Sequence, residues 1–580
     1  MAATTTLTRR SSRSKVEPTA NGKPNRTNKA ASAKSKANGA QKKRPATPEP
    51  EDSEEEQSQQ PTKRARSAKL ERESSSGSTD EEVREINKGL KNAALETGKN
   101  GAEEKKKSTR RPKKDTKATD AKSTAVKKTA RTITNPLPTP PEHSRPANQL
   151  FVWGAGNFGQ FGMGPAHLGE FDKPKKNIWI EKKIEEGAFG GEEAGIESIA
   201  AGGLHTMFID EKGTIWSCGV NDDAALGRVT KDVPNPEKEG ETIDIDTLTS
   251  FPYPLQTLVD EGFRAVSIAA GDSICTAISD QGELRVWGSF RANEGSLGFS
   301  NGSKFQFLPA PILNLPKDEK VASVAAGNNH LVVLTTFGNI YTWGAGEQGQ
   351  LGRKIIERRK IHGTTPEKVT LRSRSLKAVA IGAGNYASFA VDEKGGVWGW
   401  GLNNMGQIGT GHEDEGDNMV PQPQRIDVLS PEALGNGARI TQIVGGEHHT
   451  LFLSSDGRVF ACGRANGGQL GLPTDHAALK AEGSEGFVAT PTRIPFPDSA
   501  SEDPVVHISA GTHTNFAVTS AGALYAWGEG NQGELGIGDD MDAKTPTVVV
   551  RKEGGSWKAI AAECGGQHSL GLFRKKTAQT

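Results

Sequence analysis

Residues Trp343 to Gly352 read WGAGEQGQLG, and similar segments recur along the chain. Trp153 to Gly162 reads WGAGNFGQFG, Trp527 to Gly536 reads WGEGNQGELG, and weaker copies lie between them. In seven copies, the glycine after the Trp or Cys lies at position 154, 219, 288, 344, 401, 463 or 528. A motif repeated every 56 to 69 residues indicates one array of repeats rather than several unrelated domains.

A second motif opens another strand in each unit. It reads Ala-Gly-x-x-His in the clearest copies, and an apolar segment and an Asp/Gly turn follow it. Alternating segments joined by such turns predict an all-β fold. Histidines at one repeat offset, as in four of the copies, are typical of braces between neighbouring turns; they are His205, His330, His449 and His568. Polar residues beside them that do not repeat are better candidates for contacts with a partner. These are Asp272, Asn329, His448 and His513.

Each unit is long enough for a four-stranded blade, and radial repetition leaves no long exposed sheet edge. The spacing exceeds the period of about 40–50 residues of WD and kelch propellers. Leu150-Phe151-Val152 is a lone strand before the first full unit, and the last unit ends near Phe573. We therefore predict an all-β, seven-bladed β-propeller over residues 146–580, in which the N-terminal strand completes the C-terminal blade and closes the ring.

The net charge of +1 conceals two oppositely charged parts. Residues 1–150 contain 34 Lys and Arg but 19 Asp and Glu, a balance of +15, which leaves −14 for the remainder. All aromatic residues lie after position 150. A highly charged segment without aromatic residues cannot bury enough apolar surface to offset its ordering entropy. Residues 1–145 are therefore predicted to be a disordered basic tail.

Short basic clusters interrupt this tail and indicate nuclear import or contact with DNA phosphates. The import candidates are Lys42, Lys43, Arg44, Lys63, Arg64 and Arg66. The candidates for DNA contact are Arg110, Arg111, Lys113 and Lys114. A merely solvated tail is the alternative. An import receptor and a nuclear location are the corresponding predictions.

Several classes of protein are excluded by composition and motif spacing. The mean hydropathy is −0.58, and no apolar run approaches the length of about 18 residues that spans a bilayer. The four cysteines form no CxxC pair, which argues against a zinc site or a disulfide framework. GxGxxG occurs at Gly154, Gly344 and Gly528, but no amphipathic helix follows, as a dinucleotide site requires. We expect no cofactor, no bound metal and no membrane association.

Several unit-specific stretches resemble the regulator of chromosome condensation family: WGSFRANEG, GEQGQLGR, NDDAALGR, GGEHHT and GGQHS. The resemblance covers roughly residues 148–575. It implies a seven-bladed propeller that exchanges guanine nucleotide on the nuclear GTPase Ran while bound to chromatin. Such a factor is not an enzyme with covalent chemistry of its own. A non-catalytic propeller scaffold on chromatin is the alternative function.

The resemblance also assigns residues to a GTPase-binding face and to an exchange wedge. The face comprises Asp272, Asn329, His330, Arg353, His448 and His568. The wedge holds the two-residue insertion of the third copy and comprises Phe290, Arg291, Ala292, Asn293, Glu294, Gly295, Ser296 and Leu297. At position 329 well-known members carry Asp, so the amide here puts any electrostatic role of that carboxylate in doubt.

A basic stretch after the fourth copy is the candidate for contact with the acidic histone surface of the nucleosome. It includes Lys354, Arg358, Arg359 and Lys360, and it continues to Arg372 and Arg374. A solvated loop is the alternative interpretation. We expect the stretch to act separately from the wedge, on a different face. The predicted partners are thus a Ran-type GTPase, the nucleosome with its DNA and an import receptor, and the chain is expected to be a monomer.

Overall fold

The described part of the chain is residues 132–577 apart from 237, 412–417, 482–485, 498–501 and 539–540, in a computed structural model. The import clusters and the cluster from Arg110 to Lys114 lie outside the described residues. In the part that is described, no helix is long and apolar enough to cross a bilayer.

Antiparallel four-stranded meanders make up most of the described chain. The first three sheets hold β3 (Ile196–Ala201), β4 (His205–Asp210), β5 (Ile215–Gly219) and β6 (Tyr253–Pro254); β7 (Ala265–Ala270), β8 (Ile274–Ser279), β9 (Leu284–Gly288) and β12 (Gln306–Ala310); and β13 (Val321–Ala326), β14 (His330–Thr335), β15 (Ile340–Gly344) and β16 (Glu367–Val369).

The following strands are β17 (Ala378–Ala383), β18 (Ala387–Asp392), β19 (Val397–Leu402), β20 (Met419–Arg425), β21 (Ile440–Gly445), β22 (His449–Ser454), β23 (Val459–Arg464), β24 (Phe487–Arg493), β25 (Val505–Ala510), β26 (Thr514–Thr519), β27 (Leu524–Gly528) and β28 (Ala543–Val550). One parallel bridge, Ala383 to Val444, joins β17 to β21, so the meanders β17–β20 and β21–β24 form one eight-stranded sheet. Strands β25 to β28 form a sheet of their own.

Short helices and one small hairpin lie in the connections. They are α2 (Ile178–Glu185), α3 (Ile245–Ser250), α4 (Gln256–Asp260) and α5 (Pro431–Leu434), the 3-10 turns η1 (Pro165–His167), η2 (Glu357–Thr364), η3 (Asp427–Leu429) and η4 (Ala477–Leu479), and the hairpin β10 (Arg291–Ala292) with β11 (Gly295–Ser296). The structure is therefore all-β in its core.

The two ends of the folded part share one sheet, in the order β2-β1-β30-β29. Its strands are β1 (Asn148–Ala155), β2 (Glu170–Lys176), β29 (Trp557–Cys564) and β30 (His568–Lys575). Strand β1 pairs with β30 from Asn148 opposite Arg574 to Gly154 opposite His568. The predicted closure of the last sheet by the N-terminal strand is confirmed.

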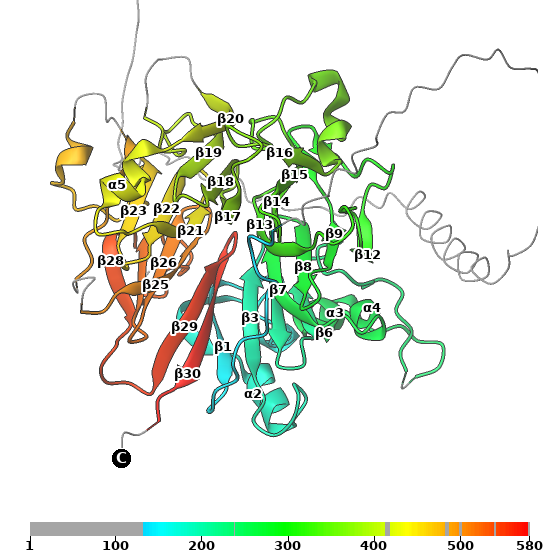
Figure 1. The fold of residues 1–580 in the computed structure, drawn as a ribbon. Coiled ribbons are helices and arrows are strands. Elements are labelled where there is room, and N and C mark those ends of the chain that lie inside the picture. The colour runs from blue at the N-terminus through cyan, green and yellow to red at the C-terminus, as the bar shows by residue number, and fades with distance from the viewer. Residues whose placement is uncertain are drawn as a thin grey trace, which may run out of the picture. The chain divides into compact units, whose positions relative to one another are not determined.

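The sheets follow one another around a ring (Figure 1). The first strand of each four-stranded meander contacts the first strand of the next meander. The series runs from β3 through β7, β13, β17, β21 and β25 to β29, and β29 contacts β3 again. The fold is an all-β propeller. The second strand of each meander, such as Ile274–Ser279, is buried along its whole length because it has sheet neighbours on both sides and packed sheets above and below. The expected alternation of apolar and polar residues is therefore lost there.

The repeated glycine after the Trp has a steric cause. Gly344 has φ 127°, and a Cβ built on it would lie 2.4 Å from the carbonyl oxygen of Asn329. Gly528 has φ 114° and is equally crowded by the His513 carbonyl. A left-handed backbone against a neighbouring strand accepts only glycine. These glycines thus serve the turn, as the absence of a following helix predicted.

A buried polar network crosses most joints between neighbouring sheets. At the joint between β13–β16 and β17–β20, His330 Nε2 lies 2.9 Å from Ser388 Oγ. Ser388 Oγ donates to the carbonyl of Gln350, 2.8 Å away, and Trp400 Nε1 donates to the same oxygen over 2.9 Å. One backbone carbonyl of the Gly-Gln-Leu-Gly turn therefore ties its own sheet to the next.

The same arrangement recurs at other joints. The histidine pairs are His205 with Cys275, His449 with Asn515, and His568 with Thr206. Where a Cys replaces the Trp, its thiol faces the corresponding carbonyl, as for Cys462 Sγ at 3.5 Å from the Gln407 oxygen. The prediction that the repeated histidines are structural braces is confirmed.

One joint lacks this network. Between β7–β12 and β13–β16 the corresponding positions hold Ile274 and Leu331, and Trp343 Nε1 is buried with no hydrogen-bond partner among the described residues. The two-residue insertion in the third copy replaces the usual turn there. Phe290, which opens the insertion, is fully buried and packs with Trp343 in an apolar cluster instead.

Residues 132–147, which we call the strap, lie along the sheets before β1. Residues 132–145 of the strap belong to the range predicted as disordered tail. Asn135 is nevertheless buried, and its Nδ2 donates to the carbonyls of Thr335 and Ala378, both 3.0 Å away. Those acceptors belong to two neighbouring sheets. The folded part therefore extends N-terminal of residue 146, because polar strap side chains satisfy backbone groups that turns leave open.

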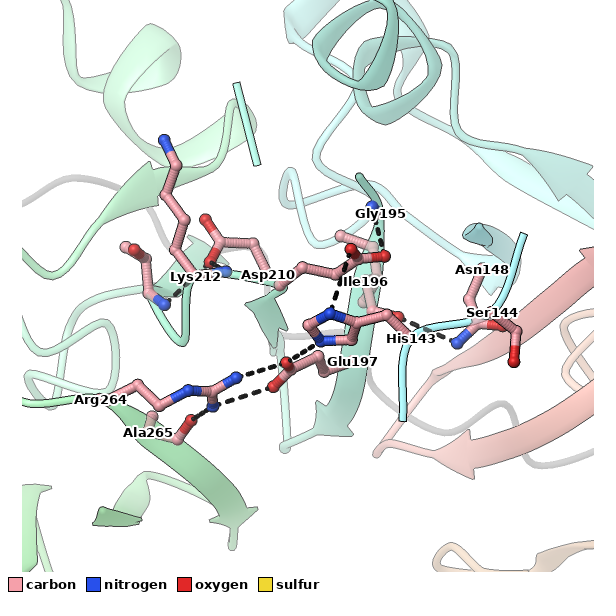
Figure 2. Close-up of polar contacts among 12 residues, drawn as sticks. His143, Ser144, Asn148, Gly195, Ile196, Glu197, Asp210, Lys212, Arg264 and Ala265 are labelled. Atoms are coloured by element: carbon pink, nitrogen blue, oxygen red, sulfur yellow. Dashed lines mark hydrogen bonds and ion pairs between the residues drawn. The ribbon is translucent and has the colours of Figure 1, made fainter. Parts of the chain in front are cut away.

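The C-terminal half of the strap satisfies two carboxylates that are almost fully buried. His143 Nε2 lies 2.6 Å from Glu197 Oε1, and the Glu197 side chain is 2% exposed. Arg264 donates to both oxygens of that carboxylate (Figure 2). Arg145 donates to both oxygens of Glu211 over 3.0 and 2.9 Å. Removal of the strap would leave these carboxylates with fewer donors.

We expect the free energy of unfolding to decrease as the pH decreases, because the bracing histidines stay neutral in the folded state. Burial lowers the pKa of His205, His330 and His449 to about 4 and that of His568 to about 3. An unfolded histidine takes up a proton near pH 6.5, so the unfolded state binds more protons from there down to about pH 4. The contribution of these histidines to stability is fully present above pH 6.5 and is lost as the pH falls toward 4. His449→Gln should reduce the slope of the unfolding free energy against pH by about one proton, or about 1.4 kcal/mol per pH unit. Urea unfolding between pH 7.5 and 4.5 measures this slope. The matched control is His362→Gln, at an exposed position; an equal change of slope in both variants would contradict the prediction.

Arg145→Ala should destabilise the fold by about 1–3 kcal/mol, because Glu211 loses a bidentate charged donor. Glu142→Ala, at an exposed neighbouring position, should stay within about 0.5 kcal/mol of the parent. Urea unfolding of the full chain measures both. Equal stability of Arg145→Ala and the parent would show that the strap is not part of the folding unit.

Candidate GTPase-docking face

The propeller presents two faces of different construction. Strands of a meander alternate in direction, so the first and third connections of each sheet lie at one edge and the second connection at the other. In every sheet, the edge with the first and third connections carries the Ala-Gly-x-x-His loop and the Gly-rich loop. These edges together form what we call the loop face. The opposite edges carry tight turns such as residues 335–338, and the strap crosses this turn face. The wedge, between β9 and β12, belongs to the loop face.

The wedge is a small hairpin whose base is anchored in the core. Arg291 pairs with Ser296 and Ala292 with Gly295. Phe290 is 0% exposed and packs 5.2 Å from Phe299, measured between ring centroids. Phe290, which was predicted as part of the wedge, is therefore its buried anchor. The exposed positions are Arg291, Asn293, Glu294 and Ser296.

Neighbouring sheets hold the wedge on both sides. Arg291 Nη1 lies 2.9 Å from Asp223 Oδ2, in the preceding sheet's loop. The backbone N–H of Arg291 donates to Asn329 Oδ1 over 2.8 Å, and that of Asn293 donates to Glu347 Oε2 over 3.0 Å, both in the following sheet. Asp223 and Glu347 lie in the unit-specific stretches NDDAALGR and GEQGQLGR, but nothing in those stretches indicates a contact with the wedge. Only the fold brings them to the wedge.

The role of Asn329 follows from this geometry. Its contact with the wedge uses a side-chain oxygen as acceptor, and amide and carboxylate groups both provide one. The amide, at a position where the resemblance implies Asp, therefore preserves this contact. The expected electrostatic loss at position 329 does not extend to the anchoring of the wedge.

Asp272 lies at the mouth of the ring close to a second carboxylate. Burial raises the pKa of the Asp272 carboxyl; Arg291 lowers it, and the nearby Asp223 raises it. Arg291 of the wedge thus lies near two acidic groups, Asp272 from its own sheet and Asp223 from the preceding sheet. The inner strands line a central cavity of about 370 Å³, and Asp272 contributes to its rim.

Of the three histidines assigned to the GTPase-binding face, His448 remains accessible, with 20% of its side chain exposed. His513, the other histidine expected to contact a partner, is 26% exposed. Burial lowers the pKa of His448, and the neighbouring Glu447 raises it. His330 and His568 are 0% and 1% exposed and are bonded across joints between sheets. They brace the ring from buried positions, which disfavours their assignment to the docking face.

The basic stretch after β15 does not lie apart from the wedge. Arg353 donates to the carbonyls of Gly363 and Thr365 and so braces its own loop. Lys360 Nζ reaches the wedge residue Glu294 at 2.8 Å. The expected separation of this stretch from the wedge therefore fails for Lys360, because η2 folds back toward β10–β11. Lys354, Arg358 and Arg359 are exposed there.

The continuation of the stretch reaches the other face. Arg372 and Arg374 are exposed and follow β16, in the connection to β17 on the turn face. The backbone N–H groups of Thr134 and Asn135 in the strap donate to the carbonyl of Thr336 on the same face, and the Asn135 side chain also donates to the carbonyl of Ala378.

In the described residues, no group of three or more His, Cys, Asp or Glu is placed to hold a metal ion.

The profile of the RCC1-like domain matches residues 149–571. The chain belongs to the RCC1-like domain family. Among relatives of this RCC1-like propeller, the guanine nucleotide exchange factor SRM1 of Saccharomyces cerevisiae is 32% identical over 73% of this chain and 86% of its own. The protein pim1 of Schizosaccharomyces pombe is 36% identical over 73% and 74%, and the human regulator of chromosome condensation is 31% identical over 75% and 92%.

Solved structures agree with the sequence relatives. Prp20p of Saccharomyces cerevisiae, described with its binding properties to Gsp1p and histones, has a TM-score of 0.64 at 30% identity and covers 75% of this chain and 93% of its own. Yeast RCC1 (Prp20) with Kap60 bound has a TM-score of 0.65 at 29% identity, covering 82% and 97%. The fold of the RCC1-like propeller described above is thus that of solved relatives.

We expect Asn329→Asp to leave the wedge in place and Asn329→Leu to release it, because Leu offers no acceptor to the Arg291 N–H. Hydrogen–deuterium exchange of the amides in residues 290–298 measures this: Leu should speed exchange about tenfold, which is about 1.4 kcal/mol of lost protection. Exchange in the Asp variant should match that of the parent. Equal protection in all three proteins would show that Asn329 does not hold the wedge.

Proposed function

We propose that this protein is a guanine-nucleotide exchange factor for a Ran-type small GTPase and that it acts on chromatin. The observation that carries the proposal is the wedge: an exposed polar hairpin, present in one unit of the repeat and held by the sheets on both sides. The relatives of this chain include a named guanine nucleotide exchange factor, and one solved relative was characterised for binding to Gsp1p and histones.

The mechanism uses differential binding and no covalent chemistry. A rigid wedge beside the acidic mouth of the ring would bind the nucleotide-free GTPase more tightly than the loaded form. By linkage, the factor then lowers the affinity of the GTPase for its nucleotide by the same ratio. Each factor of ten in that ratio corresponds to about 1.4 kcal/mol. The factor would accelerate exchange in both directions, and the nucleotide present in excess would set the outcome.

We infer that the propeller has seven blades. Support comes from the meanders themselves: the eight-stranded sheet divides at the single bridge between β17 and β21, and the remaining four-stranded sheets complete the ring of contacts. Each blade then corresponds to one copy of the sequence motif. The predicted disorder of residues 1–131 lies outside the described residues and remains a prediction.

We assign chromatin and import contacts to the basic segments. The balance of −14 after residue 150 disfavours DNA on average, so contact with DNA falls to the N-terminal clusters and to local patches. The candidates for contact with the acidic histone surface remain Lys354, Arg358, Arg359, Arg372 and Arg374. A solved relative carries Kap60, which supports an import receptor as a partner of this chain and a nuclear location.

The alternative is a propeller scaffold on chromatin without exchange activity. It would use the same ring to gather partners. The elaborate support of the wedge favours exchange, since a scaffold has no need of a single hairpin fixed from both sides.

The proposal is tested by release of fluorescent GDP from a purified Ran-type GTPase with residues 132–580, which include the strap. We expect strong acceleration by the parent and a loss of about tenfold or more in a wedge variant, Arg291→Ala with Asn293→Ala and Ser296→Ala. These substitutions spare the Phe290 anchor.

The matched control is Glu393→Ala with Lys394→Ala, at exposed positions in the β18–β19 turn on the turn face. It should exchange at the rate of the parent. Binding of the GTPase by a folded propeller without acceleration would favour the scaffold. Equal loss in the wedge variant and the control would refute the wedge as the acting element.

A further inference from the structure

The wedge has little structure of its own to fix its direction. Its strands β10 and β11 contain two residues each. The joint beneath it lacks the polar network found at other joints, and Trp343 Nε1 has no partner there among the described residues. Contacts from outside the hairpin must therefore determine how the wedge stands.

A three-membered cluster of charges closes over the side of the wedge. Lys360 Nζ lies 2.5 Å from Glu347 Oε1 and 2.8 and 2.9 Å from the two oxygens of Glu294. Glu347 Oε2 accepts the backbone N–H of Asn293. Glu347 thus uses one oxygen to hold the wedge backbone and the other to hold Lys360, which in turn holds the wedge side chain. We call Glu347 and Lys360 the clamp.

The clamp is better shielded than an ordinary surface ion pair. The side chains of Glu347 and Lys360 are 12% and 17% exposed, whereas Glu294 at the outer end is 73% exposed. Exposed pairs contribute little because water and side-chain entropy compete with them. A shielded pair with charge-assisted hydrogen bonds in defined geometry is less weakened by water, and it limits the motion of the wedge that it holds.

We infer that Glu347 and Lys360 are positioning residues for nucleotide exchange, which hold the wedge in its acting orientation before the GTPase docks. This inference rests on the proposed function. A hairpin fixed in advance loses less conformational freedom on docking, so more of the binding energy acts on the nucleotide site. The clamp also occupies Lys360, which the sequence placed among the nucleosome contacts.

A graded series of variants separates the parts of the clamp. Glu347→Gln keeps an acceptor for the Asn293 N–H but removes the charge opposite Lys360, and Glu347→Ala removes both. Lys360→Met removes the cation, and Lys360→Arg retains it. Lys354→Met is the matched control, because Lys354 is an exposed lysine of the same loop.

Each variant is measured by GDP release over a range of GTPase concentrations and by thermal unfolding. Loss of positioning should lower kcat more than it raises KM, because the rest of the docking face is unchanged. We expect kcat to fall about tenfold in Glu347→Ala and about threefold in Glu347→Gln and Lys360→Met. Lys360→Arg and Lys354→Met should match the parent, and all Tm values should agree within about 2 °C.

The outcomes distinguish the clamp from the proposed function. Absence of exchange by the parent itself would refute the proposed function. Exchange by the parent with an unchanged kcat in Glu347→Ala would overturn the clamp alone, and so would a defect in Lys360→Arg equal to that of Lys360→Met. Amide exchange of residues 290–298 gives a second readout without the GTPase: it should speed up in Glu347→Ala, and unaltered protection would overturn the clamp.

Discussion

The ring depends on a backbone carbonyl that is shared across the joints between sheets. At the Gln350 carbonyl, donors from Ser388 and Trp400 of the next sheet converge on one oxygen, and His330 holds the serine. Because such a group is buried, an unpaired donor or acceptor there would be costly. The geometry of the Gly-rich turn therefore has to recur with the repeat, and the Trp and the hydroxyl or amide side chain have to meet it. Gly344 and Gly528 are needed for the same turn, where no side chain fits.

The one joint without this network lies under the wedge. Ile274 and Leu331 replace the polar partners, and Phe290 fills the space with apolar contact. The two-residue insertion thus removes a structural element in order to place a hairpin on the loop face. The hairpin takes its support from outside, through Asp223, Asn329, Glu347 and Lys360. A hairpin thus replaces the ordinary turn where the repeat is broken, and its orientation depends on residues of other sheets.

Residues that repeat were easier to interpret than residues that do not. His205 and His449 were recognisable as braces because they share an offset, and the structure buries both against the next sheet. His330 and His568 share that offset too, so their burial was implied by the same rule; the family resemblance led instead to the docking face. Asp223 and Glu347 give no periodic signal, since their importance comes from contact with a neighbouring insertion. Asn135 lies in a stretch without aromatic residues, and composition cannot show that two turns offer it acceptors.

Patterns along the sequence were enough to establish the all-β class, the repeat and its period, the closing strand at Leu150-Phe151-Val152 and the contrast of charge between tail and propeller. Each of these follows from local patterns, which repeat or accumulate along the chain. Tertiary structure alone decided which charged groups meet: Lys360 with Glu294 and Glu347, Arg145 with Glu211, and Arg291 with Asp223. These pairs join residues separated by 13 to 68 positions, and their formation depends on how neighbouring sheets rotate around the ring. No local pattern encodes that rotation, because it results from the packing of all the sheets together.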